Sequence, residues 1–234
     1  MERIVTATPI AILAVALATS TFLFWRYIWF FRNPPRIVAP GDNLVSTADG
    51  KIVYVKRLSA DSDVIVIKKG VSAKISDIVR EDVSTPKVLI GTFMSPLDVH
   101  YNRSPLEGRV DFVRHYPAKT KNLNMGPMQL RTLLNLRPYY RNSTHIIENE
   151  RSVTRITGLF KGRLISCYVV QIAGGHVSGI DSYVAQGSGL GKGEIFGMIR
   201  IGSQVDVILP DLSDMKILVS EGDRVKAGES VLIE

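Results

Sequence analysis

The sequence is poor in the side chains that form disulfides and metal sites. Its 234 residues include one cysteine and four histidines. A single cysteine excludes an intramolecular disulfide, and Cys167 lies in the apolar run 164–172, where a buried and inert thiol is expected. The histidines have no spacing typical of metal ligands, so we predict no metal site. They are His100, His115, His145 and His176.

Two patterns that define large classes of proteins are also missing. No Gly-rich loop ends in Gly-Lys-Ser/Thr, which argues against a P-loop for phosphate. The soluble part has no stretch with the periodicity of a long amphipathic helix. With 45% hydrophobic and 22% charged residues, the chain is nevertheless typical of a globular protein.

The net positive charge of the chain favours a partner with a negatively charged surface. Lysine and arginine outnumber aspartate and glutamate by 29 to 22, for a net charge of +7. A basic surface suits nucleic acid, and it equally suits the anionic face of a membrane. Because the chain also carries a membrane segment, we expect a membrane and no nucleic acid as its partner.

That membrane segment is the uncharged run from Ile4 to Trp25. A helix needs about 20 such residues to cross a bilayer. One alternative is a cleaved signal peptide, since residues 16–18 read Ala-Leu-Ala, and another is an apolar hairpin that re-enters the bilayer. The run continues to Trp25, which favours a retained anchor over residues 1–29. Arg26, Arg32 and Arg36 outnumber the lone Arg3, which predicts that the body lies on the cytoplasmic side of the cell membrane.

Residues 30–234 are predicted to form one mainly β domain. Alternating or β-branched runs predict strands at 51–53, 64–67, 88–93, 106–116 and 217–233. Residues 153–159 and 164–172 read as a hairpin around Lys161-Gly162. Residues 118–140 lack a clean periodicity and read mainly as a long loop. Gly202-Ser203 lies between two further alternating runs, at 197–201 and 205–209.

Five blocks in this domain carry a resemblance when they are taken together. Gly197 to Pro210 reads G-M-I-R-I-G-S-Q-V-D-V-I-L-P, residues 95–100 read S-P-L-D-V-H, and residues 46–50 read S-T-A-D-G. N-E-R at 149–151 and V-Q-I-A-G at 170–174 extend the pattern. In this order the blocks resemble the phosphatidylserine decarboxylases of the short bacterial and archaeal type, which include archaetidylserine decarboxylases.

The resemblance implies a self-cleaving proenzyme. The Gly202–Ser203 bond would break, and Ser203 would become a covalent pyruvoyl group, the cofactor of the enzyme. The positions that match the family's triad are Asp49, His100 and Ser203, in which a base activates the hydroxyl and a carboxylate orients the base. The mature enzyme would be a heterodimer of a large N-terminal and a small C-terminal fragment of the same chain.

The resemblance also implies the substrate, an aminophospholipid whose amine would form a Schiff base with the pyruvoyl group. Arg103, Arg109 and Arg200 are candidate partners for the lipid phosphate. The chain departs from the family at Arg103, where many long-type relatives have a second histidine. It also departs at Ile201 and Gln204, since the short type usually reads R-F-G-S-R-V-D.

A second resemblance concerns the scaffold. Residues 219–232 resemble the turn and strand of biotinyl and lipoyl carrier domains, and the Asp49-Gly50 segment resembles an opening strand of the same barrel-sandwich architecture. The carrier lysine is missing, so lipoylation is not expected. The alternative function is a non-enzymatic, membrane-tethered barrel-sandwich adaptor. Such adaptors insert a long helical hairpin, and no heptad pattern exists in this chain.

Overall fold

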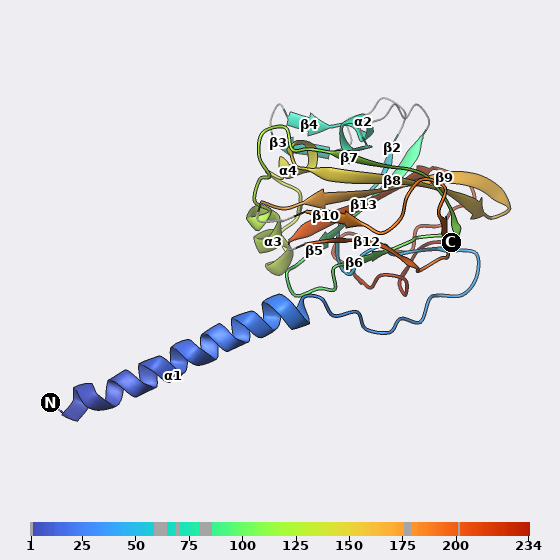
Figure 1. Ribbon diagram of the computed structural model, residues 1–234. Coiled ribbons are helices and arrows are strands. Elements are labelled where there is room, and N and C mark those ends of the chain that lie inside the picture. The colour runs from blue at the N-terminus through green and yellow to red at the C-terminus, as the bar shows by residue number, and fades with distance from the viewer. Residues whose placement is uncertain (1, 59–64, 69–70, 80–85, 176–178, 201) are drawn as a thin grey trace. The chain divides into compact units, whose positions relative to one another are not determined.

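The computed structural model describes residues 2–58, 65–68, 71–79, 86–175, 179–200 and 202–234 (Figure 1). The chain forms two compact units, Met1–Pro34 and Pro35–Glu234. We call the second unit the body. Val64, the first residue of one predicted strand, lies outside the described residues, as does Ile201 next to the predicted cleavage site.

The N-terminal unit is helical, as its uncharged run predicts. Helix α1 covers Glu2–Phe24 and continues into the π-helical turn η1, Trp25–Trp29. The 21-residue segment Pro9–Trp29, which runs from α1 through η1, is long and apolar enough to cross a membrane, by length and composition. Arg32 stacks on Trp29, with its guanidinium carbon 4.3 Å from the ring centroid, which is the geometry of a cation–π contact.

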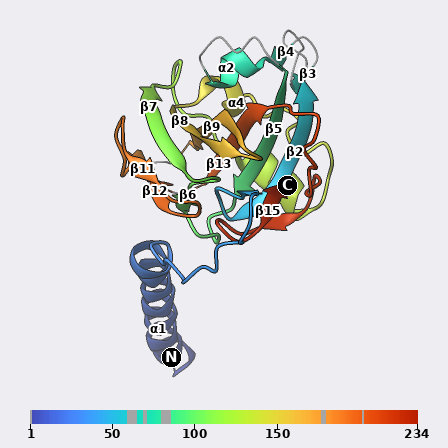
Figure 2. The ribbon, with the colours of Figure 1, turned by 90° about the vertical axis from the view of Figure 1, so that its right-hand side faces the viewer.

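The body is built on one curled antiparallel sheet of eight strands, which forms a half-barrel (Figure 2). The strand order is β11-β7-β8-β9-β13-β5-β2-β14, so that β13 lies near the centre and has a partner on both edges. The strands cover Gly189–Leu190 (β11), Gly108–Tyr116 (β7), Arg151–Phe160 (β8), Arg163–Ala173 (β9), Ser203–Pro210 (β13), Lys87–Met94 (β5), Gly50–Leu58 (β2) and Arg224–Val225 (β14). The mainly β prediction is confirmed.

Three smaller sheets and three short helices complete the described part of the body. A three-stranded sheet has the order β10-β12-β6, with strands Ile180–Ser182, Ile195–Ile199 and Tyr101–Arg103. Leu44–Val45 (β1) pairs with Val231–Ile233 (β15), and Ile65–Lys68 (β3) pairs with Val71–Ala73 (β4). The helices are Ile75–Val79 (α2), Gly126–Leu133 (α3) and His145–Glu148 (α4).

The hairpin of β8 and β9 forms where the sequence predicts it. Ten residue pairs connect the strands, from Arg151–Ile172 to Phe160–Arg163. Lys161 and Gly162 both have positive φ, 51° and 70°, as a tight two-residue hairpin turn requires. The predicted strand 217–233 is reduced to the short strands β14 and β15, because turns at Gly222 and Gly228 interrupt it.

The prediction of a long loop at residues 118–140 is wrong in part. Helix α3 lies inside this segment, with Pro127 at its first turn, where a missing N–H costs nothing. The helix escapes the usual pattern because its buried side chains, Met128 and Thr132, are few, and its leucines point outward. With so few buried positions, the segment has no clean helical period of apolar residues by which the helix could be predicted.

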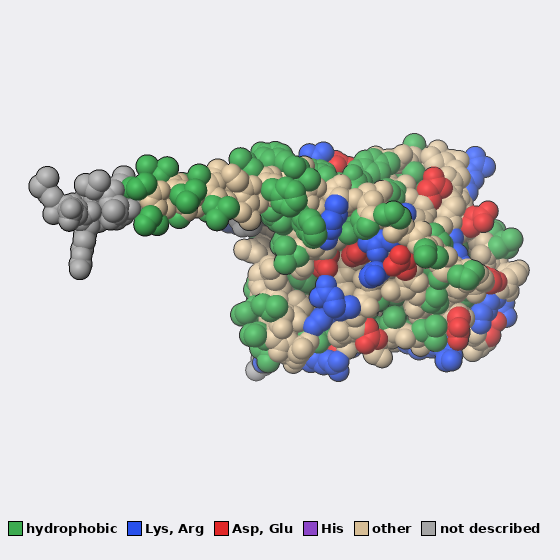
Figure 3. Space-filling view, turned by 90° about the horizontal axis from the view of Figure 1, so that it is seen from below, with side chains coloured by type: hydrophobic (Ala, Val, Ile, Leu, Met, Phe, Trp, Pro, Cys, Tyr) green, Lys and Arg blue, Asp and Glu red, His purple; other side chains and the backbone are tan. Residues whose placement is uncertain are grey.

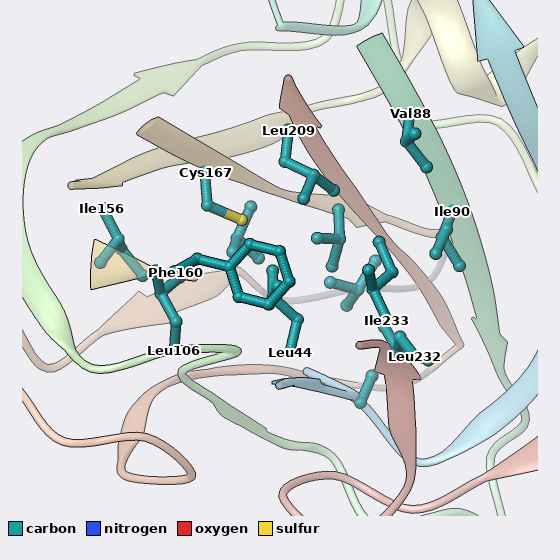
Figure 4. Packing of buried hydrophobic residues seen from close by; sticks show 14 of the residues in the cluster. Leu44, Val88, Ile90, Leu106, Ile156, Phe160, Cys167, Leu209, Leu232 and Ile233 are labelled. Atoms are coloured by element: carbon teal, nitrogen blue, oxygen red, sulfur yellow. The ribbon is translucent and has the colours of Figure 1, made fainter. Parts of the chain in front are cut away.

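The two faces of the sheet bury separate hydrophobic clusters. One cluster fills the hollow of the half-barrel, where Leu44, Phe160, Leu209 and Ile233 meet (Figure 4). Cys167 belongs to this cluster, and burial raises the pKa of its thiol to about 12, so it is the inert thiol predicted. The second cluster lies on the other face, under α2, α3 and α4, and includes Tyr54, Met128, Ile146 and Ile208.

Candidate active site

Ser203 is the first residue of the central strand β13. It pairs with Met94 of β5 on one side and with Ala173 of β9 on the other, and its side chain is fully buried. Its Oγ donates a hydrogen bond to the thioether sulfur of Met94 at 3.3 Å. A thioether is a weak acceptor, so this contact places the hydroxyl in an apolar environment without a strong hydrogen bond to hold its proton.

Gly202, immediately before this serine, adopts a left-handed backbone with φ of 57°. A Cβ built on Gly202 meets no described atom within 4 Å, so the need for glycine comes from the backbone and not from crowding. Gly202 also lines a cavity of about 90 Å³ together with Phe93, Pro96 and Met125. The predicted cleavage bond therefore borders a small space at the start of the central strand β13.

His100 lies against the strand that leads to this bond. Its carbonyl accepts a hydrogen bond from the N–H of Ile199, at 3.4 Å, four residues before Ser203. Its Nδ1 lies 2.9 Å from the carbonyl oxygen of Asp98. Because a carbonyl only accepts, Nδ1 carries the proton and Nε2 is the basic nitrogen of the neutral ring. The ring is buried, as a base in a water-poor site would be.

Asp98 is held in turn by its own loop. Its Oδ2 accepts the N–H of Ser95 at 2.8 Å, and its Oδ1 accepts a hydrogen bond from Arg224 at 2.8 Å. The S-P-L-D-V-H block is therefore a closed turn that fixes the carbonyl group on which the His100 ring is oriented. Sequence reasoning assigned no role to Asp98, although the spacing of two residues before the histidine is the signal that marks it.

Asp49 lies immediately before β2, and its carboxylate accepts hydrogen bonds from two groups. One comes from the guanidinium of Arg36 at 2.7 Å and the other from the N–H of Ala227 at 2.8 Å. The side chain of Arg36 is only 6% exposed, so this is a largely buried ion pair. The hydrogen bond from Ala227 joins the Asp49 block to the C-terminal turn, and the role of Asp49 in orienting His100 remains a prediction.

The three arginines predicted to bind phosphate lie in different surroundings. Arg103 donates to the carbonyl of Gly193 at 2.8 Å, and burial together with the charge of Arg36 lowers its pKa. Arg200 forms an ion pair with Asp181 at 3.0 Å. Arg109 lines a separate groove of about 320 Å³. Their roles in binding remain predictions.

A buried polar network occupies the opposite face of β13. The Gln204 amide group donates to Asp206 Oδ1 at 2.8 Å, and the Tyr54 hydroxyl donates to Asp206 Oδ2 at 2.7 Å. His145 Nε2 lies 3.2 Å from Gln204 Oε1, which only accepts, so His145 is the donor. Gln204 is thus hydrogen-bonded at both ends of its amide, directly after Ser203.

Burial perturbs the acid–base groups of this network. It raises the pKa of Asp206 to about 7, against the opposing effect of the hydrogen bonds from Gln204 and Tyr54. It lowers the pKa of His145 to about 4, against the opposing effect of the hydrogen bond to Gln204. The pKa of Tyr54 is raised well above its ordinary value, first by burial and then by Asp206.

Gly91 makes this network possible. Strand β5 separates Tyr54 on β2 from Asp206 on β13, and Gly91 pairs with both residues. A Cβ on Gly91 would lie 2.3 Å from Cε2 of Tyr54. The missing side chain therefore leaves the space through which the Tyr54 ring crosses β5 to reach the carboxylate.

Asn149 connects the wall of the Gly202 cavity to the sheet. Its Nδ2 donates to the carbonyls of Leu123 and Ala173, at 2.9 and 2.7 Å, and its Oδ1 accepts the N–H of Leu123 at 2.8 Å. Ala173 is the partner of Ser203 in the sheet. The N-E-R block was the available signal for this residue, but its partners are distant in sequence.

Among the residues that the structure describes, no group of three or more His, Cys, Asp or Glu side chains is placed to hold a metal ion. Ser203 itself provides a buried hydroxyl after a left-handed glycine, and the backbone of His100 is bonded to the strand that leads to it.

Comparison with known proteins agrees with this arrangement. Residues 23–233 match the family model described as phosphatidylserine decarboxylase. A protein of Methanopyrus kandleri named as an archaetidylserine decarboxylase proenzyme is 36% identical over 222 residues, which cover 94% of this chain and 85% of the relative. A phosphatidylserine decarboxylase proenzyme of Xanthobacter autotrophicus is 32% identical, with coverage of 97% and 86%. The chain therefore belongs to the phosphatidylserine decarboxylase family.

Proposed function

We propose that this chain is a self-processing, pyruvoyl-dependent decarboxylase that converts phosphatidylserine or archaetidylserine to the ethanolamine phospholipid. The observation that supports it most is the junction at Gly202–Ser203. There a buried serine hydroxyl follows a left-handed glycine, beside a segment that holds an oriented histidine. Family membership supports the reaction class, and we assign the roles of this reaction to Ser203, His100 and Asp49.

Self-cleavage would proceed in steps that these residues can support. His100 Nε2 would accept the proton of the Ser203 hydroxyl as the oxygen attacks the carbonyl carbon of Gly202, which replaces the amide with an ester. Loss of the Ser203 Cα proton would then break the ester C–O bond and release a chain that ends in the Gly202 carboxylate. Hydrolysis of the remaining dehydroalanine would release ammonia and leave the ketone. In this proposal the Asp49 carboxylate orients His100, as the carboxylate of the family's triad would.

The pyruvoyl group, once formed, supplies an electron sink for the departing carboxylate. It would take the place of Ser203 at the first position of β13, and the cavity lined by Gly202 leaves room for a small headgroup. His100 is the titratable group proposed to return a proton to the product. Arg103 and Arg200 are proposed as partners for the lipid phosphate, which requires that Arg200 exchange its contact with Asp181.

The two fragments would stay together without a covalent bond. Residues 203–210 form β13, which pairs with β5 and β9 of the large fragment along most of its length. β14 pairs with β2, and β15 pairs with β1. These pairings join the two segments that resemble biotinyl and lipoyl domains, which supports a barrel-sandwich scaffold as part of this proposal.

We place the enzyme at the cell membrane, with the anchor over residues 1–29 and the body on the cytoplasmic side. The support is the length and composition of the helix and the three arginines that follow the apolar run. The adaptor alternative is not favoured, because the family match extends through the whole body.

The test is the intact mass of the purified full chain. We expect two fragments that end at Gly202 and begin at residue 203, and the small fragment should resist Edman degradation and react with carbonyl reagents. Ser203→Ala should give one intact, inactive chain, and Ser203→Cys should retain some cleavage because a thiol can make the same acyl shift. A single intact chain that decarboxylates the lipid would overturn the pyruvoyl mechanism, and an intact inactive wild-type chain would favour the adaptor.

A further inference from the structure

Helix α3 turns its leucines away from the body. Met128 is buried in the cluster beneath the helix, whereas Leu130 and Leu133 are exposed, Leu133 by 77%. Leu134 and Leu136 continue the exposed apolar surface after the helix ends. We call Leu130, Leu133, Leu134 and Leu136 the leucine ridge. A lone exposed leucine is ordinary, but four within one helix and its C-terminal turn mark a contact surface.

The leucine ridge borders a groove that leads toward the cleavage site. Leu133 lines this groove, of about 380 Å³, and Leu97 lines it as well. The groove shares Phe93, Pro96 and Gln129 with the cavity that Gly202 lines. The groove beside the ridge therefore adjoins the cavity that borders the bond at which the chain is proposed to be cut.

The ridge lies in a segment of one charge sign. Residues 117–147 contain five lysines and arginines and no aspartate or glutamate. Arg131 lies between Leu130 and Leu133 in sequence, and Arg141 follows the ridge. Asp98, an acidic residue of the groove, is paired with Arg224. Figure 3 shows apolar side chains at the left-hand edge of the body, the side on which Figure 1 draws α3, with Lys and Arg side chains nearby.

We propose that the leucine ridge, with Arg131 and Arg141, forms a second membrane-contact surface, which docks the body on the anionic headgroup layer of a bilayer. Lys119, which pairs with Glu148, and Arg137, which donates to the carbonyl of Glu221, are not part of this surface. A short helix with leucines on one side and basic residues beside them has the composition typical of a segment that lies at a membrane interface. The cations would be attracted to anionic lipid, and the leucines would enter the boundary between headgroups and acyl chains. Only the delivery of a lipid through the groove to Gly202 rests on the proposed function.

The test uses the full chain carrying Ser203→Ala, so that neither cleavage nor activity enters the result. Leu133→Cys is labelled with an environment-sensitive dye and reconstituted into vesicles of phosphatidylcholine and phosphatidylglycerol that contain nitroxide-labelled lipid. We expect a blue shift and a several-fold loss of emission. The native Cys167 is buried and has a raised pKa, so the chain without an added cysteine should take up no dye.

The matched control is Leu164→Cys on the β8–β9 hairpin. Leu164 is 72% exposed and also has a basic neighbour, Arg163, but this arginine is paired with Asp214. Dye at this position should show no quenching by the labelled lipid. Leu136→Cys provides a second position on the ridge if labelling at residue 133 disturbs the fold. Phosphatidylglycerol is not a substrate, so failure of the proposed decarboxylase would not change the result.

The charged part of the surface is tested by Arg131→Gln combined with Arg141→Gln. Quenching at residue 133 should fall in this variant and in vesicles of phosphatidylcholine alone, and it should weaken as salt screens the attraction. Equal quenching at residues 133 and 164 would overturn the proposal. A blue shift in detergent without lipid that grows with protein concentration would overturn it too, because it would identify a second copy of the chain as the occupant.

Discussion

The two faces of strand β13 differ in what surrounds them. On one face, Ser203 is followed by Val205, Val207 and Leu209, which belong to the apolar cluster within the half-barrel. On the other face, Gln204 and Asp206 form the buried polar network with Tyr54 and His145. Successive side chains of a strand point to opposite faces, so one residue step separates the two environments.

One face of β13 therefore leaves the Ser203 hydroxyl reactive, and the other face holds the backbone beside it in position. Ser203 has a thioether as its recorded hydrogen-bond partner, which leaves the hydroxyl available to a base. Gln204 is held through both ends of its amide, which fixes the backbone one residue away. Substitutions near the serine should therefore change the cleavage rate, whereas substitutions in the network should first change stability.

The largest effect is expected at the base. His100→Gln should slow self-cleavage by about 100-fold or more, because general bases typically contribute about 10²–10⁴-fold. The rate is measured as the loss of the uncut chain on a denaturing gel. Asp49→Asn should also leave the chain uncut if Asp49 assists the base. Because Asp49→Asn breaks the largely buried ion pair with Arg36, the melting temperature of this variant must be measured in parallel. Fast cleavage in both variants would exclude these residues from the proposed triad.

The network should determine how stability depends on pH. The raised pKa of Asp206 means that the folded state binds the extra proton, so stability should fall as pH rises from about 4 to about 7. The lowered pKa of His145 has the opposite sign, and stability should rise between about pH 4 and 6.5. The two contributions oppose each other in the wild-type chain.

Single variants should separate these contributions. In Asp206→Asn, the free energy of unfolding should rise with pH between about 4 and 6.5 relative to wild type, by at most about 3 kcal/mol. In His145→Gln, the free energy of unfolding should fall with pH over the same range, relative to wild type. Denaturant titration in the Ser203→Ala background measures both slopes. Parallel curves for the two variants would show that neither group titrates as its burial requires.

Gly91→Ala should break the connection between β2 and β13. The new Cβ would lie 2.3 Å from Tyr54, so the ring must move away from Asp206. Overpacking of this kind typically costs about 1–3 kcal/mol, and chemical denaturation measures it. Gly162→Ala is a useful comparison, because no described atom lies within 4 Å of a Cβ there and only the positive φ opposes it. An equal loss in both variants would argue against crowding at Tyr54.

The smallest change is expected for Tyr54→Phe. It removes the hydrogen bond that the hydroxyl donates to Asp206 and the one that it accepts from Gln204, and it retains the ring, which should cost about 1–2 kcal/mol. Because the first of these hydrogen bonds lowers the pKa of Asp206, its loss should raise that pKa further and extend the pH dependence upward. NMR titration of the carboxyl carbon measures the shift. An unchanged pKa would show that the hydroxyl does not contact the carboxylate in solution.

Sequence patterns predicted the elements whose signals are local. The uncharged run at residues 4–25 predicted a helix, and alternation with Lys161-Gly162 predicted the β8–β9 hairpin. The Gly202-Ser203 junction between two strands was also predicted, apart from Ile201, which lies outside the described residues. Helix α3 was missed because it buries only two side chains and turns its leucines to solvent, so its apolar residues do not follow the period of a buried helix face.

The sequence by itself determined the period of each strand, the length of the apolar helix and the blocks that carry the family resemblance. These depend on residues that are neighbours in the chain. Only the tertiary structure decided which side chains meet, such as Tyr54 with Asp206 across Gly91, or Asn149 with Leu123 and Ala173. Such contacts depend on strand order and register, which place residues far apart in sequence beside each other. Their hydrogen bonds are required because polar groups buried there have no water to bind.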